Sequence, residues 1–242
     1  MTSIQVVTPY LGVEWALQDM LVSFGESDIP VLIIDNSPDS DLTPRPWYMP
    51  PNVTIETFPQ NIGVSASWNK GLAKSADQTL IVSQWVRFSP AEFQQRPLSW
   101  GLNHVARMMG AFANEYGMTF GDQGYHCISI GRETVNRIGY FDENFKVFGN
   151  DDDYSHRIEL ANKLPDTHII MGGNASGGAS QKDLGVFSIA FAVHQRMGAF
   201  ENMDGADSTE YYEKKWNGIP GIYEHPFGDS ANGLDYWPEV EA

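Results

Sequence analysis

Apolar residues in the first 88 positions follow two alternating patterns. Short, mostly apolar runs predict buried strands at residues 4–10, 31–35, 53–58 and 79–83. Between these runs, apolar residues recur at helical spacing and predict helices at residues 14–24 and 65–75. Strands that alternate with helices are typical of the α/β class, so we expect a mainly parallel, doubly wound sheet with helices on both faces.

The pattern is looser beyond Phe88. It predicts a helix from about residue 102 to 116, a strand at 125–130, a short helix at 132–138, a strand at 167–171 and a short helix around 211–216. The glycine-rich residues 172–178 predict a loop. Neither a long linker nor an internal repeat divides the sequence, so we expect a single domain over residues 1–242.

Charge narrows the classes of function. The chain has 15 basic and 31 acidic residues and a net charge of −16, which disfavours a protein whose main task is to grip a nucleic-acid backbone or an anionic membrane. Cys127 is the single cysteine, no leader-like segment opens the sequence, and no apolar run reaches the ~20 residues of a membrane-spanning helix. We therefore expect a cytoplasmic protein without an integral membrane segment, and its oligomeric state stays open.

The most informative stretch runs from Phe141 to Arg157. It places Asn150 and three acidic residues, Asp151–Asp153, at the start of a predicted helix whose apolar positions are Tyr154, Ile158, Ala161 and Leu164. Acidic residues favour the positive N-terminal end of a helix. The carboxylates therefore either cap and solvate the helix, or at least one of them faces a site in front of it.

Four segments carry motifs in a fixed order. The strand ends Val6–Tyr10 and Ile33–Ser37 come first, followed by Asn61-Ile-Gly63 and Asn69-Lys-Gly71 around the start of a helix. The third segment, Gly139–Arg157, contains Phe-Asp-Glu and then the acidic run, and the fourth is Tyr211–Gly218 with His225-Pro-Phe227. Together they resemble the GT-A glycosyltransferases, specifically the large inverting family that includes rhamnosyl- and galactosyltransferases. The resemblance extends over nearly the whole chain.

The resemblance implies a GT-A fold and a role for each segment. Residues 1–88 would form the nucleotide-binding half, and residues 89–242 the acceptor and catalytic half with C-terminal loops. Asp151 aligns with the general base of the family. The nucleotide would be bound by Thr8, Pro9, Tyr10, Asp35, Asn61, Ser65 and Asn69. We therefore expect an enzyme that transfers a sugar with inversion from a nucleotide diphosphate-sugar, first of all a UDP-sugar, to a hydroxyl acceptor.

The same motifs also have ordinary structural interpretations. Residues 61–71 are compatible with a plain loop-to-helix turn, Asp35 with a turn residue after a strand, and Trp216 with a core residue. The order and spacing of the segments favour the glycosyltransferase interpretation. The position of Asp35 at the carboxyl end of a strand, where open α/β sheets bind ligands, favours a binding role for this residue.

One departure from the family concerns metal binding. At the end of the fourth strand these enzymes carry an Asp-x-Asp signature that holds a divalent cation, but this chain has Ser83, Gln84 and Trp85 there. Mg²⁺ or Mn²⁺ would lack its anionic ligand at this position. Either another carboxylate holds a metal, or cationic side chains neutralise the leaving diphosphate, or catalysis is lost. Candidates for the diphosphate or acceptor region are Gln84, Trp85, Asp152, Asp153, Lys214, Lys215 and Trp216, and candidate metal ligands are Asp152, Asp153 and His225.

Two other functions remain as alternatives. A catalytically inactive binder of a sugar nucleotide or a glycan would keep the nucleotide pocket and lose turnover, in agreement with the missing acidic signature. A viral-type transferase that acts on modified DNA bases is the second alternative, and the net charge of −16 opposes it. The donor sugar, its nucleobase and the acceptor are not specified by the sequence.

Overall fold

The computed structural model describes residues 2–37, 49–88, 102–103, 105–107, 109, 117–120, 126–145, 148–163, 169–172, 186–188 and 206–216. Within them, the main sheet has seven strands in the order β3-β2-β1-β4-β7-β6-β8. Their bounds are β1 Ile4–Tyr10, β2 Val31–Asp35, β3 Val53–Thr57, β4 Gln78–Val82, β6 Gly117–Phe120, β7 Cys127–Gly131 and β8 Ile170–Gly172. A second, two-stranded sheet pairs β5 (Val86–Phe88) with β9 (Val186–Ser188).

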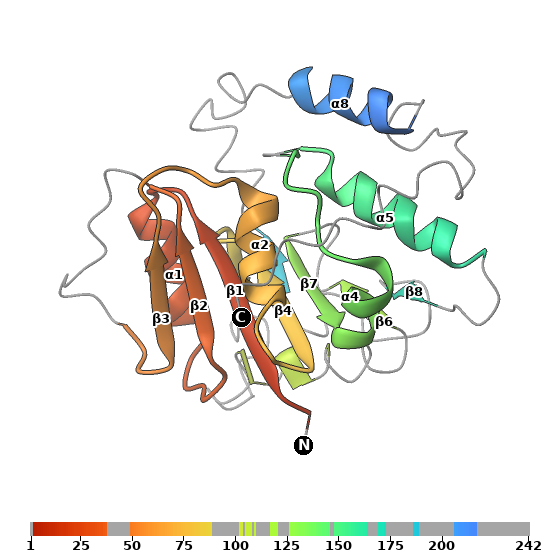
Figure 1. Cartoon of the computed structure of the whole chain (residues 1–242). Helices are drawn as coiled ribbons and strands as arrows, with labels where there is room; N and C mark the ends of the chain where they lie inside the picture. Colours follow the sequence, from red (N-terminus) through yellow and green to blue (C-terminus); the bar gives the residue numbers. More distant parts are fainter. Residues whose placement is uncertain are drawn as a thin grey trace.

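The main sheet is mostly parallel, as predicted. Strand β1 pairs in parallel with β2 and β4, β2 with β3, and β6 with β8. Strand β7 runs antiparallel to both of its neighbours, β4 and β6. The parallel strands β1 to β4 therefore end at one common edge, here called the carboxyl edge, which lies at the top of Figure 1.

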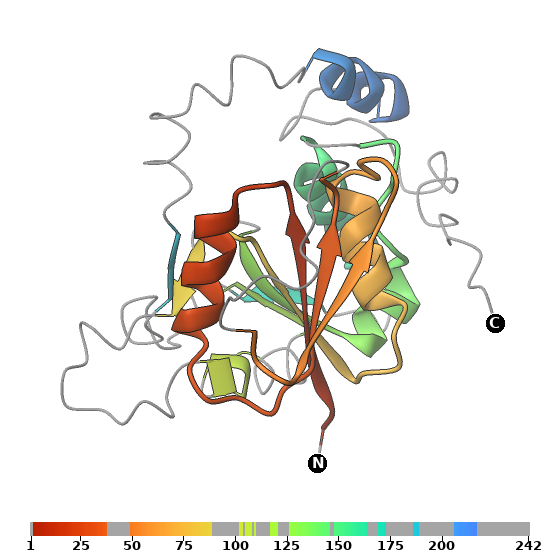
Figure 2. The same cartoon turned by 90° about the vertical axis from the view of Figure 1, so that its left-hand side faces the viewer.

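Helices cover both faces of the sheet, which confirms the doubly wound α/β prediction. Helix α1 (Glu14–Ser23) lies on one face, and α2 (Val64–Leu72), α4 (Arg132–Ile138) and α5 (Asn150–Ala161) lie on the other (Figures 1 and 2). Successive strand residues point to opposite faces, so Val6 packs in the core under α1 whereas Val7 packs against Trp68 of α2 and Ile158 of α5. Burial on both faces explains why these strands are continuous apolar runs.

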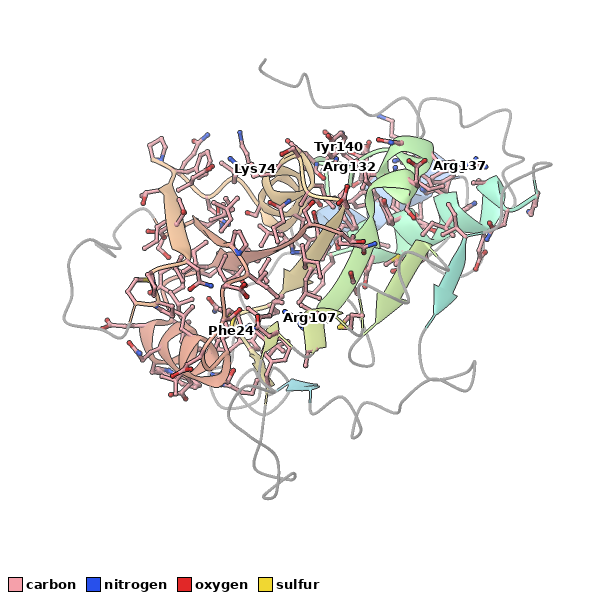
Figure 3. All side chains as sticks on the ribbon, turned by 90° about the horizontal axis from the view of Figure 1, so that it is seen from below. Phe24, Lys74, Arg107, Arg132, Arg137 and Tyr140 are labelled. Carbon is pink, nitrogen blue, oxygen red and sulfur yellow. The ribbon has the colours of Figure 1, made fainter. Side chains whose placement is uncertain are left out.

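Helix α2 is shorter than predicted and ends at Leu72 instead of residue 75. The side chain of Arg132, at the start of α4, reaches the carbonyl groups that follow the end of this helix. It donates to the carbonyl oxygens of Leu72 at 2.6 Å, Lys74, and Ala76 at 3.1 Å. Arg132 thus satisfies backbone acceptors that a longer helix would bond internally. Figure 3 shows Arg132 close to Lys74 at the lower side of the molecule.

The reversed direction of β7 sets the path of the chain toward α5. Cys127 lies opposite Val82 and Gly131 opposite Gln78, so β7 descends from the carboxyl edge to the opposite edge. Helix α4 begins there, and α5 starts near the carboxyl edge (Figure 1). The sequence predicted this strand at residues 125–130 but not its direction.

Other predictions differ in extent. Within the helix expected at 102–116, the described residues 102–103, 105–107 and 109 are helical. The strand expected at 167–171 corresponds to β8. The short C-terminal helix is longer than predicted and forms α8 (Ala206–Trp216). Strands β5, β6 and β9 were not predicted. The glycine-rich loop lies outside the described residues, apart from Gly172.

Two features concern the outside of the molecule. Strand β3 forms one edge of the main sheet, and its residues are partly buried or exposed, with Glu56 paired to Lys74 at 2.9 Å. In the described part of the chain, none of the helices combines the length and the apolar character that crossing a membrane requires.

Candidate functional site

The carboxyl edge brings together the predicted residues of β1, β2 and β4. Tyr10 lies opposite Asp35 in the parallel pair β1 and β2. The Thr8 hydroxyl donates to the Val82 carbonyl oxygen at 2.5 Å, and the Leu11 backbone N–H donates to Gln84 Oε1 at 3.1 Å. These bonds join the ends of β1 and β4, so residues far apart in the sequence share one edge.

Asp35 is fully buried at the end of β2. One carboxylate oxygen accepts a hydrogen bond from the backbone N–H of Ser37 at 3.0 Å. This contact is the turn role that the sequence offered as an alternative. It uses one oxygen of a carboxylate that also lies at the ligand-binding edge of the sheet.

The start of α2 faces the same edge. Asn61 Oδ1 accepts a hydrogen bond from the Gly63 N–H at 2.8 Å, and Gly63 has a φ of +88°, a conformation that favours glycine. A Cβ atom at Gly71 would lie 2.5 Å from Val7 Cβ, so this glycine allows α2 to approach β1 closely. Asn36, which directly follows β2, donates to Ser67 Oγ at 2.8 Å and accepts from the Ile62 N–H at 3.3 Å, so the N-terminal end of α2 lies beside the end of β2.

The side chains of Ser65 and Asn69 bind the backbone of the segment 139–145. Asn69 Nδ2 donates to the Phe141 carbonyl oxygen at 2.8 Å, and Asn69 Oδ1 accepts from the Phe141 N–H at 2.9 Å. Ser65 Oγ donates to the Phe145 carbonyl oxygen at 2.7 Å. Both side chains are buried. The sequence predicted nucleotide binding for these residues, and the structure gives them a role within the fold that was not predicted.

The first turn of α5 carries Asp151 to the carboxyl edge. Gly149 precedes the helix with a φ of +80°, and Asn150 Oδ1 accepts a hydrogen bond from the Asp151 N–H at 3.0 Å. Asp151 is half-buried, and its Oδ1 accepts from the Asp152 N–H at 3.0 Å. Asp152 is more exposed than Asp151. The pKa of its carboxyl group is raised because the protein displaces part of the surrounding water and because the negative charge of Asp151 is close.

Asp153 has a different environment from its two neighbours. It is fully buried and accepts hydrogen bonds from Arg157 Nε at 3.0 Å and from Trp216 Nε1 at 2.8 Å. Lys215 Nζ lies 2.7 Å from Asp153 Oδ1, the same oxygen that accepts from Trp216. The charge of Asp153 is thus balanced inside the protein, so this residue belongs to the packing of α8 on α5.

Lys215 also contacts a second buried carboxylate, Asp142. Lys215 Nζ and the Tyr211 hydroxyl donate to Asp142 Oδ2 at 2.7 and 2.9 Å, and the Asn144 side chain donates to Oδ1 at 2.8 Å. Burial alone would raise the pKa of Asp142, but the charge of Lys215 and these hydrogen bonds outweigh burial and lower the pKa. Burial and the nearby charge of Asp142 raise the pKa of Tyr211.

The other predicted residues of the C-terminal region are separated by their exposure. Lys214 is exposed, whereas Trp216 is fully buried and stacks on His156 with ring centroids 4.1 Å apart. The core role offered for Trp216 is therefore confirmed. The sequence did not predict the roles of Asp142, Asn144 and Tyr211, although all three lie within the recognised motifs.

At the end of β4, the position of the acidic signature holds uncharged side chains. Gln84 is buried, and Trp85 is half-buried with its ring centroid 6.2 Å from that of Trp15. Arg87 donates to the Gln84 carbonyl oxygen at 2.9 Å, and burial lowers the pKa of its guanidinium group despite the charge of Asp19. Among the described residues, no three His, Cys, Asp or Glu side chains gather as metal ligands would. His225 lies outside the described residues.

Comparison with known proteins finds no matching family model and no similar curated protein. Among solved structures, S. aureus TarS 1–349 is 14% identical over 66% of this chain and 56% of its own, with a TM-score of 0.47. Mannosyltransferase PcManGT from Pyrobaculum calidifontis, in complex with GDP-Man and Mn²⁺, is 16% identical over 71% of this chain and 55% of its own, with a TM-score of 0.46. A Drosophila β1,4-galactosyltransferase 7 variant, with manganese, UDP-Gal and xylobiose, is 10% identical over 100% of this chain and 84% of its own, with a TM-score of 0.44. The chain spans about half the length of the first two proteins.

Proposed function

We propose that this chain is a GT-A glycosyltransferase that moves a sugar from a nucleotide diphosphate-sugar to a hydroxyl acceptor with inversion. The observation that carries the proposal is the meeting of separate motifs at one edge. Asp35 ends β2, α2 begins after Gly63, and Asp151 lies in the first turn of α5. A UDP-sugar is the donor to test first.

Each part of this edge has a chemical task in the proposed reaction. The ends of β1 and β2 would hold the nucleoside, and the positive N-terminal end of α2 would face the diphosphate. The acceptor hydroxyl oxygen would form a bond to the anomeric carbon while the bond from that carbon to the diphosphate oxygen breaks. Asp151 would take the hydroxyl proton, and the nucleoside diphosphate would leave from the opposite face of the sugar, which inverts the configuration.

Asp151 is the best base among the three consecutive carboxylates. Asp153 is fully buried and bound to Arg157, Lys215 and Trp216. Asp151 is half-buried, and no cation among the described residues pairs with it. A general base needs a carboxylate that is within reach of the substrate and has capacity to accept a proton.

The test is a transfer and binding screen with UDP-, GDP- and dTDP-sugars. The wild-type protein should bind one donor in calorimetry and release the nucleoside diphosphate when an acceptor is present. Asp151→Asn should lower turnover by about 10²–10⁴-fold, the usual effect of losing a general base, with nucleotide affinity unchanged. Asp152→Asn is the matched control and should retain turnover. Normal turnover in Asp151→Asn would assign the base to Asp152.

A catalytically inactive sugar-nucleotide binder is the second candidate. Two observations favour it: uncharged Ser83, Gln84 and Trp85 replace the acidic signature, and the Lys215 ammonium is already paired with Asp142 and Asp153. Such a protein would bind the donor as tightly as an enzyme does. It would show neither transfer nor donor hydrolysis, with or without Mn²⁺.

A further inference from the structure

Lys215 joins two parts of the site that are otherwise separate in the chain. Its Nζ lies 2.7 Å from a carboxylate oxygen of Asp142, in the segment 139–145, and 2.7 Å from one of Asp153, in α5. The Lys215 side chain is 11% exposed, and those of Asp142 and Asp153 are 3% and 0% exposed. In such a buried environment an unpaired carboxylate is costly. Among the described residues Lys215 is the cation paired with Asp142, whereas Asp153 is paired with both Lys215 and Arg157.

The contact with Asp153 fixes the first turn of α5. The Asp153 N–H donates to the Gly149 carbonyl oxygen at 2.9 Å, which closes that turn. Asp151 lies two residues earlier, and at about 100° per residue its side chain points roughly 200° away around the helix axis. Asp153 can therefore be anchored under α8 while Asp151 faces a different direction.

The contact with Asp142 connects this anchor to α2. Asn69 and Ser65 of α2 bind the backbone of Phe141 and Phe145, which flank Asp142 in the segment 139–145. In the described part of the chain, Lys215 is the cation that pairs with both this segment and α5. Asp153 also pairs with Arg157 within α5, and Arg157 Nη1 donates to the Ile138 carbonyl oxygen at 2.9 Å, so Arg157 holds α5 against the end of α4. Lys215 adds the direct link between the first turn of α5 and Asp142.

We propose that Lys215 is a positioning residue, which holds the first turn of α5, and with it Asp151, in register with the donor side of the site by bridging Asp142 and Asp153. This inference rests on the proposed function, because it assigns Asp151 as the base. Lys215 acts through the two carboxylates and does not touch the substrate. A displacement of the base by about 1 Å is enough to lower turnover by about 10²-fold.

The test compares Lys215→Met with Lys215→Arg and with Lys163→Met. Methionine keeps an apolar chain of similar length without the charge, whereas arginine keeps the charge. Lys163 is an exposed lysine just after α5, so Lys163→Met controls for the loss of a positive charge. The measurements are kcat, the donor KM, nucleotide affinity, the melting temperature, and hydrogen exchange of the peptide that covers residues 148–157.

For Lys215→Met we expect a fall in kcat of at least about tenfold, a donor KM within about twofold of wild type, and faster exchange at residues 148–157. Lys215→Arg should recover most of the kcat, and Lys163→Met should match wild type. A wild-type kcat in Lys215→Met would overturn the proposal. So would a loss that arginine does not restore, or one explained by the unfolded fraction alone.

Two further experiments distinguish a failure of this proposal from a failure of the proposed function. If Lys215→Met does not fold, Asp142→Asn removes one of the two bridged carboxylates and should show the same selective loss of kcat. If the wild-type protein transfers no sugar from any donor tested, the proposed function fails. Hydrogen exchange in Lys215→Met against Lys163→Met then still decides whether Lys215 holds the first turn of α5, and equal exchange in both would refute it.

Discussion

Asn69→Ala tests whether the buried asparagine of α2 holds the fold or binds the nucleotide. Its side-chain amide makes two hydrogen bonds with the backbone of Phe141, at 2.8 and 2.9 Å, and a third with Glu143 at 3.0 Å. The substitution leaves the Phe141 N–H and carbonyl groups without this partner in the protein interior. Each buried group left unpaired costs about 1–3 kcal/mol, and the higher helix propensity of alanine returns about 0.5 kcal/mol. We expect a net loss of about 2–5 kcal/mol in the free energy of unfolding.

Asn162→Ala is the matched control. Asn162 binds the N–H and the carbonyl oxygen of Ile169 in the same two-way manner, at 2.8 and 2.7 Å, but the residue is exposed. These bonds are only part-buried although Ile169 itself is buried, so water can replace part of them and the expected loss is smaller, about 1 kcal/mol. The two variants share the substitution and the two-way bond to a backbone, and they differ in burial, in the additional bond of Asn69 to Glu143, and in position, since Asn162 caps the end of α5.

Urea unfolding of both variants, followed by calorimetry with the nucleotide, gives the two readouts. Folded Asn69→Ala should bind the nucleotide diphosphate with an affinity within about twofold of wild type, since its side chain points to the segment 139–145. A loss of stability equal to that of Asn162→Ala would refute the reasoning. A large fall in nucleotide affinity at unchanged stability would restore the role that the sequence predicted for Asn69.

Three further predictions concern Asp142, Asp35 and metal use. The pKa of Asp142 is lowered in the folded state, so its contribution to stability is present above its unfolded pKa, about 3.9, and is lost as the pH falls through the folded value. Asp142→Asn should therefore cost stability at pH 7 and show a smaller further loss than wild type on acidification; parallel pH profiles of unfolding would contradict this. Asp35→Ala should weaken nucleotide binding in calorimetry more than it lowers the melting temperature, and the reverse result would leave only the turn role. Because Ser83, Gln84 and Trp85 replace the acidic signature, transfer should continue in excess chelator, whereas complete loss restored by Mn²⁺ would disprove metal-independent turnover.

Much of the first half of the fold could be predicted from the sequence. Strands buried on both faces leave continuous apolar runs, so β1, β2 and β4 were found within one residue of their observed bounds. The direction of β7 could not be predicted, because a strand buried on both faces has the same pattern whether it runs parallel or antiparallel. Strands β5 and β9, of three residues each, are too short to show any periodicity.

The location of the candidate site could be predicted from the sequence, but the separate roles of its three carboxylates could not. The sequence placed three carboxylates at the start of α5, and helical spacing implied that they differ in direction. The pair of Asp153 with Arg157 is local, four residues apart in α5. The contacts with α8 are distant in sequence, since Trp216 is 63 residues from Asp153 and Lys215 is 73 residues from Asp142. Local patterns carry no information on such contacts.

The exposed edge of the main sheet has a consequence for how copies of this chain behave in solution. In the described part of the chain no strand pairs with the outer side of β3, and such an edge is a template on which a second molecule can add a strand and begin to aggregate. Here the edge is five residues long, and the Glu56–Lys74 pair lies on it. A second copy stacked edge to edge would find only five residues with which to pair, one of them the charged Glu56. The short length of β3 and its charged residue therefore disfavour edge-to-edge association of two copies.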